Sequence, residues 1–128
     1  MDAPLTLLHI EDDPAIARLM SMILRFQGYH VISARSGAEA LHWVDGKHVR
    51  PDLIVTDYQL PLEETGDEVV EAIAALLGSR PPTILLTGDI SEELRERAAK
   101  VVDRVLLKPV EIELLLRELA ELSVSRAV

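Results

Sequence analysis

Residues 51–57 read PDLIVTD, an apolar run that begins at a proline and ends at an aspartate. Leu53, Ile54 and Val55 follow one another without the polar alternation of a strand that faces water on one side. Such a continuous run is typical of a parallel strand that helices cover on both faces. The run therefore predicts an α/β fold, and it leaves Asp57 at the carboxyl end of the strand.

Four more apolar runs lie on either side of this one, and amphipathic patterns separate them. The predicted strands cover residues 5–10, 29–34, 51–57, 81–88 and 104–107. The predicted helices cover residues 14–27, 36–44, 66–77, 91–100 and 111–122. Alternating strands and helices imply a parallel sheet with helices on both faces. We therefore expect a single domain over residues 1–128, with its core at about residues 5–122.

The first two predicted helices begin with recognisable capping signals. Asp13 can cap the first helix, and Pro14 suits its first helical position. Ser36 and Glu39 have the spacing of a capping box at the second helix. The apolar residues of the first helix recur at helical spacing, which predicts one buried face. That face would comprise Ile16, Leu19, Met20, Ile23 and Leu24.

Composition narrows the possible functions. The 128 residues have a net charge of −9, which argues against a nucleic-acid-binding surface, since such a surface needs a basic patch. The absence of cysteine excludes disulfides and thiolate zinc sites. No apolar run of about 18 residues and no basic leader occur. We therefore expect a cytoplasmic location without membrane contact by this domain, and we expect His9 to have a structural role.

Polar residues stand at the carboxyl ends of four predicted strands, where open α/β sheets bind their ligands. Glu11 and Asp12 follow the first strand, Asp57 ends the third, Thr87 the fourth and Lys108 the fifth. Carboxylates about 4 Å apart repel by roughly 4 kcal/mol near a protein surface. A hard cation such as Mg²⁺ or Mn²⁺ would offset that repulsion and keep Asp57 ionised as a nucleophile.

Four short motifs carry a family resemblance: IEDD, TDYQLP, LLTG and LLKP, in that order along the chain. Together they resemble the receiver domain of two-component response regulators, over essentially the whole chain. The resemblance implies a flavodoxin-like (βα)5 three-layer sandwich with the strand order 2-1-3-4-5. It also implies that the protein is a phosphoprotein of phosphorelay signal transduction. The resemblance implies no enzymatic activity other than self-dephosphorylation.

The same resemblance implies roles for the matching residues. Asp57 would accept a phosphoryl group from a phosphohistidine of a histidine kinase or histidine phosphotransfer protein. Glu11, Asp12 and Asp57 would hold Mg²⁺, together with the backbone carbonyl of Gln59. A homodimer is a family expectation. The C-terminal sequence is also similar to receivers at the end of hybrid sensor histidine kinases.

Two further residues and two departures from the family pattern concern the same site. Thr87 and Lys108 would contact the phosphoryl oxygens, and the bond from Lys108 to the following proline is expected to be cis. Gly66 follows Pro61 by five residues where the family has four, so this loop is one residue longer. Val105 stands where many receivers have Tyr or Phe, so a rotating aromatic at that position cannot carry a signal.

Three alternatives to a phosphoacceptor remain open. A receiver-like interaction module would keep the fold for docking, without phosphorylation. A flavin binder needs a hydroxyl-rich phosphate loop after the first strand, but this chain has acids there. A phosphohydrolase that uses Asp57 needs an acid two residues later, where this chain has Gln59. Other acids near the site are expected to form a solvated face and loop: Glu63, Glu64, Asp67 and Glu68.

Overall fold

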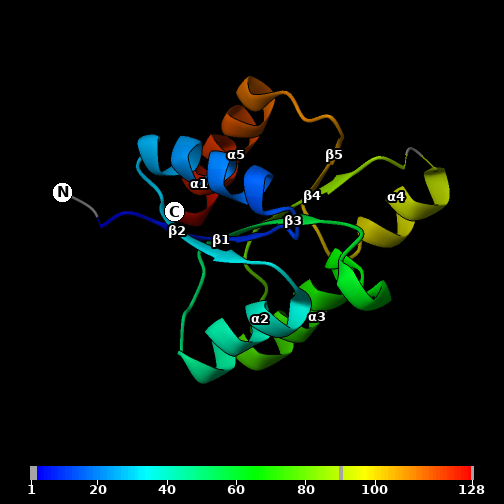
Figure 1. The fold of residues 1–128 in the computed structure, drawn as a ribbon, viewed down its shortest axis with the longest axis horizontal. Coiled ribbons are helices and arrows are strands. Elements are labelled where there is room, and N and C mark those ends of the chain that lie inside the picture. The colour runs from blue at the N-terminus through cyan, green and yellow to red at the C-terminus, as the bar shows by residue number, and fades with distance from the viewer. Residues whose placement is uncertain (1–2, 90, 128) are drawn as a thin grey trace.

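The computed structural model describes residues 3–89 and 91–127. Within them, five parallel strands form a central sheet between two layers of helices (Figure 1). The strands are β1 (Thr6–Ile10), β2 (His30–Ala34), β3 (Leu53–Asp57), β4 (Thr83–Thr87) and β5 (Arg104–Leu107). Their order is β2-β1-β3-β4-β5, which confirms the predicted topology. Each strand lies within its predicted range and is shorter by no more than two residues at either end.

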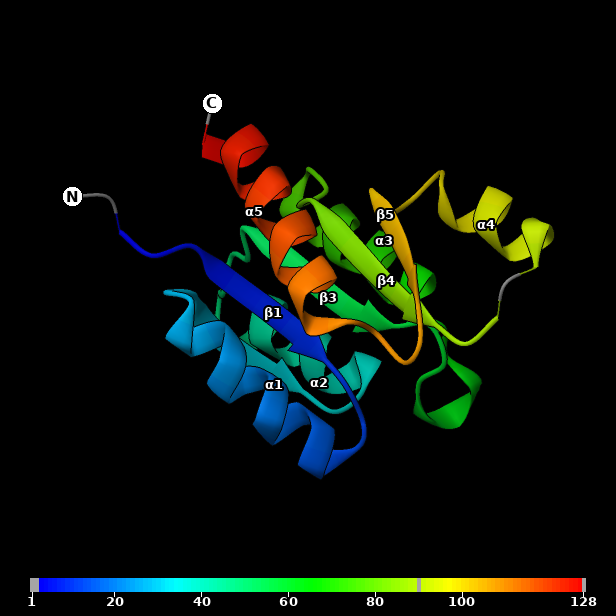
Figure 2. The same ribbon diagram turned by 90° about the horizontal axis from the view of Figure 1, so that it is seen from above.

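Two pairs of helices cover the sheet, α1 and α5 on one face and α2 and α3 on the other, while α4 lies beside β5 (Figures 1 and 2). The helices are α1 (Pro14–Phe26), α2 (Gly37–Leu41), α3 (Gly66–Leu77), α4 (Glu92–Ala98) and α5 (Ile112–Ala127). A π-helical turn, η1 (His42–Gly46), continues α2, and a 3-10 turn, η2 (Pro61–Glu63), precedes α3. Helix α5 therefore extends beyond its predicted end at Leu122. None of the described helices is long and apolar enough to cross a membrane.

The pleat of each strand divides its side chains between the two helix layers. On β1, Leu7 belongs to the core cluster that includes residues of α1 and α5. Leu8 and Ile10 belong to the cluster that includes residues of α2, α3 and α4. All residues of β3 and β4 are buried, so neither strand has a polar face. This burial explains the continuous apolar run in PDLIVTD.

The buried face of α1 differs from the prediction. Ile16 and Leu19 were expected inside, but they are 46% and 58% exposed. The small residues Ala17 and Ser21 are buried instead, and the hydroxyl of Ser21 shares a hydrogen bond of 2.9 Å with that of Ser33 on β2. Apolar periodicity could not reveal this rotation, because a hydroxyl becomes tolerable inside only once it has a partner.

Both predicted N-caps are present. The carboxylate of Asp13 accepts hydrogen bonds from the amides of Ala15 and Ile16. The hydroxyl of Ser36 accepts one from the amide of Glu39. Each bond satisfies a backbone N–H that the first helical turn leaves without a partner, and such caps contribute about 1 kcal/mol.

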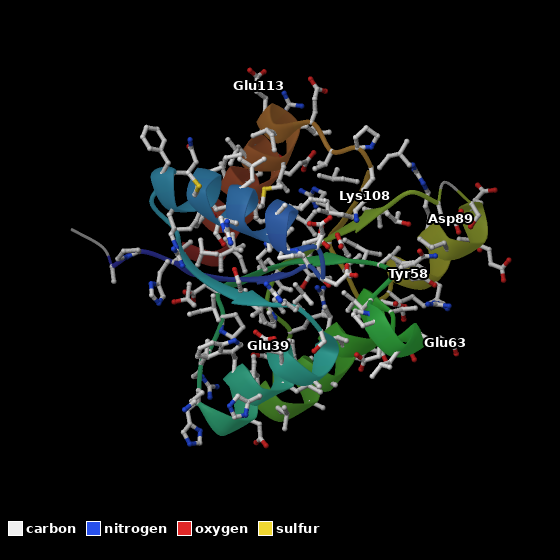
Figure 3. The ribbon with its side chains drawn as sticks, in the orientation of Figure 1. Glu39, Tyr58, Glu63, Asp89, Lys108 and Glu113 are labelled. Atoms are coloured by element: carbon white, nitrogen blue, oxygen red, sulfur yellow. The ribbon has the colours of Figure 1, made fainter. Side chains whose placement is uncertain are left out.

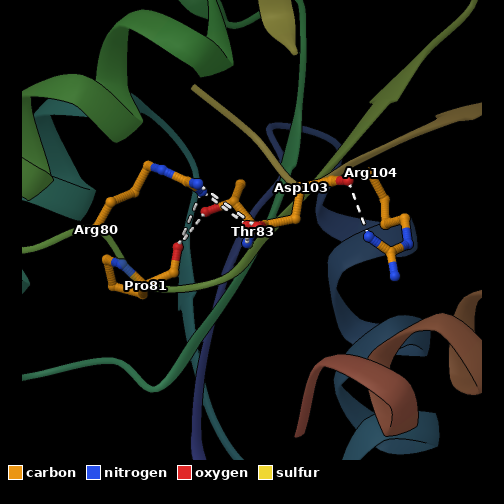
Figure 4. Close-up of polar contacts among 5 residues, drawn as sticks. All are labelled: Arg80, Pro81, Thr83, Asp103 and Arg104. Atoms are coloured by element: carbon orange, nitrogen blue, oxygen red, sulfur yellow. Dashed lines mark hydrogen bonds and ion pairs between the residues drawn. The ribbon is translucent and has the colours of Figure 1, made fainter. Parts of the chain in front are cut away.

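An ionic contact joins two connections at the amino ends of the strands (Figure 4). Arg80, before β4, and Asp103, before β5, form a salt bridge of 2.7 Å. The same oxygen of Asp103 accepts a hydrogen bond of 2.7 Å from the amide of Thr83. Asp103 therefore holds β4, β5 and the end of the α3–β4 connection together, at the edge of the sheet opposite to the predicted site.

Candidate functional site

The ends of three strands bring Asp57, Thr87 and Lys108 together. Asp57 is the last residue of β3, and only 3% of it is exposed. The amine Nζ of Lys108 lies 2.9 Å from the carboxylate oxygen Oδ1 of Asp57. The amide of Lys108 donates a hydrogen bond of 2.8 Å to the carbonyl of Thr87, which aligns the segment after β5 with β4. The Lys108–Pro109 bond is cis, as predicted.

Three carboxylates gather on the other side of the site. Glu11, Asp12 and Asp57 offer oxygen atoms that all lie within 4.8 Å of one another. Glu11 continues the pairing of β1, because its amide donates to the carbonyl of Ala34 at 2.9 Å. Glu11 is buried and Asp12 is exposed, so the group faces solvent at Asp12. Close carboxylates of this kind suit a hard divalent cation.

The electrostatics of Glu11 reflect this crowding. Burial is the largest cause that raises its pKa to about 8, and a hydrogen bond with Asp57 and the negative charge of Asp57 act in the same direction. The amide of Asp13 and the charge of Lys108 act in the opposite direction. Glu11 therefore retains a proton at neutral pH when no cation is present. A cation that binds through Glu11 must displace this proton.

Thr87 lies at the end of β4 and is buried. Its hydroxyl accepts a hydrogen bond of 3.0 Å from the amide of Asp89. Tyr58, Asp89 and Lys108 lie on the same side of the molecule, toward the carboxyl ends of the strands (Figure 3). A cleft of about 560 Å³ opens there and exposes polar groups beside the Lys108–Asp57 pair. Its lining comprises Gln59, Leu86, Thr87, Gly88, Asp89 and Lys108.

The loop after β3 accommodates its additional residue away from Asp57. Leu62 and Glu63 have φ angles of 63° and 60°, a region that residues other than glycine rarely adopt. An antiparallel bridge between Gln59 and Thr65 closes the loop below them. Gly66 then lies against β3, where an added Cβ would be 2.2 Å from the carbonyl oxygen of Asp57. The longer loop therefore still delivers a glycine where the backbones come too close for any side chain.

A cluster that the sequence did not reveal lies beside the site. Asp67 was expected on a solvated face, but that prediction is wrong, because Asp67 is only 4% exposed and pairs with Arg97 of α4 at 3.0 Å. Burial alone would raise the pKa of Asp67. Hydrogen bonds from Thr65 and Arg97, together with the charge of Arg97, outweigh burial and hold this pKa below its ordinary value. The partners are 30 residues apart, so no local pattern could indicate the pair.

His9 is buried in the sheet, with 1% of it exposed. Burial lowers the pKa of His9 to about 4, and the charge of Lys108 adds to this effect while that of Asp57 opposes it. The ring nitrogen Nδ1 has no hydrogen-bond partner among the described residues. The imidazole is therefore neutral at physiological pH, in keeping with a structural role.

The sequence matches the model of the response regulator receiver domain over residues 7–120. The chain belongs to this family. The response regulator MprA of Mycobacterium sp. (strain KMS) is 32% identical over 122 residues, which make up 93% of this chain and 50% of MprA. The probable transcriptional regulatory protein TcrX of Mycobacterium tuberculosis is 29% identical over 110 residues, or 86% of this chain and 46% of TcrX. The chain thus spans about half the length of these curated relatives.

Solved receiver structures share the fold. The CheY-like receiver domain protein from Methanospirillum hungatei JF-1 has a TM-score of 0.85 at 28% identity, with 97% of each chain covered. The chemotaxis protein CheY4 of Vibrio cholerae has a TM-score of 0.82 at 30% identity, covering 94% of this chain and 99% of CheY4. These similarities confirm the family and the flavodoxin-like fold that the motifs predicted.

Proposed function

We propose that Asp57 of this receiver domain accepts a phosphoryl group from a phosphohistidine. The donor is a histidine kinase or a histidine phosphotransfer protein of a two-component system. One observation carries the proposal: a lysine amine lies 2.9 Å from a buried carboxylate at the end of β3, next to two further carboxylates. Receiver domains are generally phosphoacceptors, so membership of the family supports the same conclusion.

The transfer is a displacement at phosphorus. A carboxylate oxygen of Asp57 forms a bond to phosphorus while the phosphorus–nitrogen bond of the donor breaks. The bonding electrons stay with the imidazole, which takes a proton from water, and Asp57 becomes an acyl phosphate. The ammonium of Lys108 neutralises charge on the phosphoryl oxygens, and the hydroxyl of Thr87 donates a hydrogen bond to one of them. Gln59 offers no general acid two residues after Asp57, which disfavours a phosphohydrolase.

The acidic group is suited to Mg²⁺ or Mn²⁺. Glu11, Asp12 and Asp57 would hold the ion through carboxylate oxygens, and Gln59 through its backbone carbonyl. The oxygen atoms of these three carboxylates all lie within 4.8 Å of one another, which supports this assignment. When bound, the ion supplies positive charge to the phosphoryl oxygens.

Phosphorylation by a small donor tests the proposal. The protein with Mg²⁺ and acetyl phosphate should gain the mass of one phosphoryl group, and a chelator should prevent that gain. Asp57→Asn should gain nothing, because an amide is not a comparable nucleophile. Asp45→Asn is the matched control, since Asp45 is an exposed acid of η1, and it should be phosphorylated like the wild type. No gain in the wild type, or an equal gain in Asp57→Asn, would overturn the proposal.

A further inference from the structure

Helix α4 is connected at its start to Thr87 by a run of three hydrogen bonds. The amide of Asp89 donates to the hydroxyl of Thr87 at 3.0 Å, and the amide of Ser91 donates to the carboxylate of Asp89 at 2.8 Å. The amide of Leu94 then donates to the hydroxyl of Ser91 at 3.3 Å, which caps the helix. Side-chain hydrogen bonds therefore connect Thr87 with the first turn of α4.

A second set of contacts holds the last turn of α4, and we call Tyr58, Asp67 and Arg97 the Arg97 cluster. The guanidinium of Arg97 binds both carboxylate oxygens of Asp67, at 3.0 and 3.3 Å. It also donates a hydrogen bond of 2.7 Å to the hydroxyl of Tyr58 and lies 5.4 Å from the centre of that ring. A two-pronged contact of this kind fixes orientation as well as distance.

Tyr58 links the Arg97 cluster directly to the phosphoacceptor, because it is the next residue after Asp57. Its amide donates to the carbonyl of Leu86 at 2.8 Å, and its carbonyl accepts from the amide of Gly66 at 2.7 Å. Both backbone groups are thus held by neighbouring segments. The ring of Tyr58 is in turn held by its contacts with Arg97.

Val105 makes these contacts more important. It packs in the same core cluster as Leu94 and Ala98 of α4. Val105 offers no aromatic ring at this position. The polar contacts that connect α4 with the region of Asp57 are instead those of Thr87 at the start of the helix and of Arg97 at its end.

We propose that Arg97 is a latch that holds α4 in a resting position and that phosphorylation of Asp57 works against it. This inference rests on the proposed function. When the hydroxyl of Thr87 turns toward a phosphoryl oxygen, it draws the Asp89–Ser91 contacts and the start of α4 toward Asp57. Arg97 holds the last turn on Tyr58 and opposes that movement. The position of α4 therefore depends on whether the Thr87–phosphoryl contact or the Arg97 cluster is the stronger.

Hydrogen exchange of the α4 amides tests the latch, with the full chain, Mg²⁺ and acetyl phosphate. In the wild type, phosphorylation should accelerate exchange in residues 92–98. Arg97→Ala should exchange about fivefold faster there before phosphorylation, because an ion pair and a hydrogen bond no longer oppose local opening. In Arg97→Ala, acetyl phosphate should then increase the exchange rate of residues 92–98 only slightly. Tyr58→Phe keeps the ring but not the hydroxyl, and Arg97→Lys keeps the charge but not the fork, so both should lie between these limits.

Arg95→Ala is the matched control. Arg95 is exposed on the same helix and forms no ion pair within the described residues, so this variant should behave like the wild type. Intact mass, measured on the same samples, separates the two proposals. A wild type without added phosphoryl mass would overturn the proposed function and the latch together. A phosphorylated Arg97→Ala protein whose α4 exchange equals that of the wild type in both states would overturn the latch alone.

Discussion

Glu11 is buried beside Asp57, and burial first, then the hydrogen bond and the charge of Asp57, raise its pKa to about 8. For a carboxyl group whose pKa is raised by folding, the folded state prefers the protonated form. The metal-free protein should therefore be destabilised as the pH rises from the unfolded value of 4.5 through about 8. Ionisation of Glu11 above about pH 8 thus destabilises the metal-free fold, and a bound cation would offset this loss.

Mg²⁺ should raise the melting temperature more at about pH 9 than at about pH 6, because at the higher pH it replaces no proton and relieves a repulsion. Thermal unfolding with and without Mg²⁺ at the two pH values measures this difference. Glu11→Gln carries no titrating group and should reduce the difference. Equal Mg²⁺ effects at both pH values would contradict the prediction.

His9 should make the protein less stable in acid. Its pKa falls from 6.5 to about 4 on folding, so the unfolded chain binds the proton more readily than the folded one. Stability from this residue is complete above pH 6.5 and is lost as the pH falls toward 4, by about 3 kcal/mol in all. Urea unfolding of the wild type and of His9→Val at several pH values tests this.

The difference between these two proteins isolates the histidine, because the carboxylates titrate in both. His9→Val should lose less stability than the wild type between neutral pH and about pH 4.5. His30→Gln is a suitable control, since His30 is exposed on β2. If the two curves for wild type and His9→Val run parallel, the imidazole is not buried as described.

At the scale of elements, the connection between β3 and α3 is the segment on which the geometry of the site depends. Two residues with left-handed backbone angles and one bridge shape its loop, and Gly66 ends it against Asp57. Backbone strain of this kind costs about 1–3 kcal/mol per residue and persists only where surrounding contacts maintain it. The contacts that enclose these two residues are the hydrogen bonds from the amide of Leu60 to the carbonyl of Glu64, at 2.9 Å, and from the amide of Glu64 to the carbonyl of Pro61, at 3.4 Å.

Gly66→Ala should damage the site more than the fold. Its Cβ would lie 2.2 Å from the carbonyl oxygen of Asp57 and 2.9 Å from Cγ2 of Thr56, so the end of β3 must move. We expect a loss of about 1–3 kcal/mol in stability together with slower phosphorylation by acetyl phosphate. Gly78→Ala is the matched control at the other end of α3, where φ is 80° and the space is open. It should lose stability but keep its phosphorylation rate.

The sequence was sufficient to predict the five strands and to predict that Asp57, Thr87 and Lys108 meet at their carboxyl ends. Apolar runs such as PDLIVTD follow directly from burial on both faces, and parallel strands bring Asp57, Thr87 and Lys108 to one edge. Contacts between distant helices were not predictable. The pairing of Asp67 with Arg97 depends on where α4 packs, and the rotation of α1 depends on a hydroxyl partner on β2. The π-helical turn after α2 likewise has no signal in local periodicity.

At the scale of the whole molecule, the contacts of Asp103 and the candidate site lie at opposite ends of the strands. Asp103 joins β4 and β5 at their amino ends, and β4 separates it from Thr87 by about 13 Å at 3.3 Å per residue. The carboxyl ends carry the acidic group of Glu11, Asp12 and Asp57 and a cleft, whereas the amino ends of β4 and β5 are joined by the contacts of Asp103 (Figure 4).

Asp103→Ala should therefore destabilise the fold without changing the chemistry. It leaves the amide of Thr83 and the guanidinium of Arg80 without their acceptor, which should cost about 1–3 kcal/mol. Urea unfolding measures the loss, and the rate of phosphorylation by acetyl phosphate should stay at the wild-type value. Arg104→Gln removes ion pairs with Glu118 and Glu121 but leaves no backbone amide without its acceptor, so it should cost less than about 1 kcal/mol. A slower phosphorylation of Asp103→Ala would show that the two ends are not independent.

The uncharged imidazole of His9 has a consequence for a phosphorylated Asp57. His9 contributes no positive charge there near neutral pH, so among the described residues beside Asp57 it is Lys108, together with a bound cation, that would compensate the charge of the added phosphate. An acyl phosphate in this position would have the neutral imidazole of His9 on its buried side and the ammonium of Lys108 on its solvent-facing side. How long it survives would then depend on what arrives from outside: water, salt or another protein.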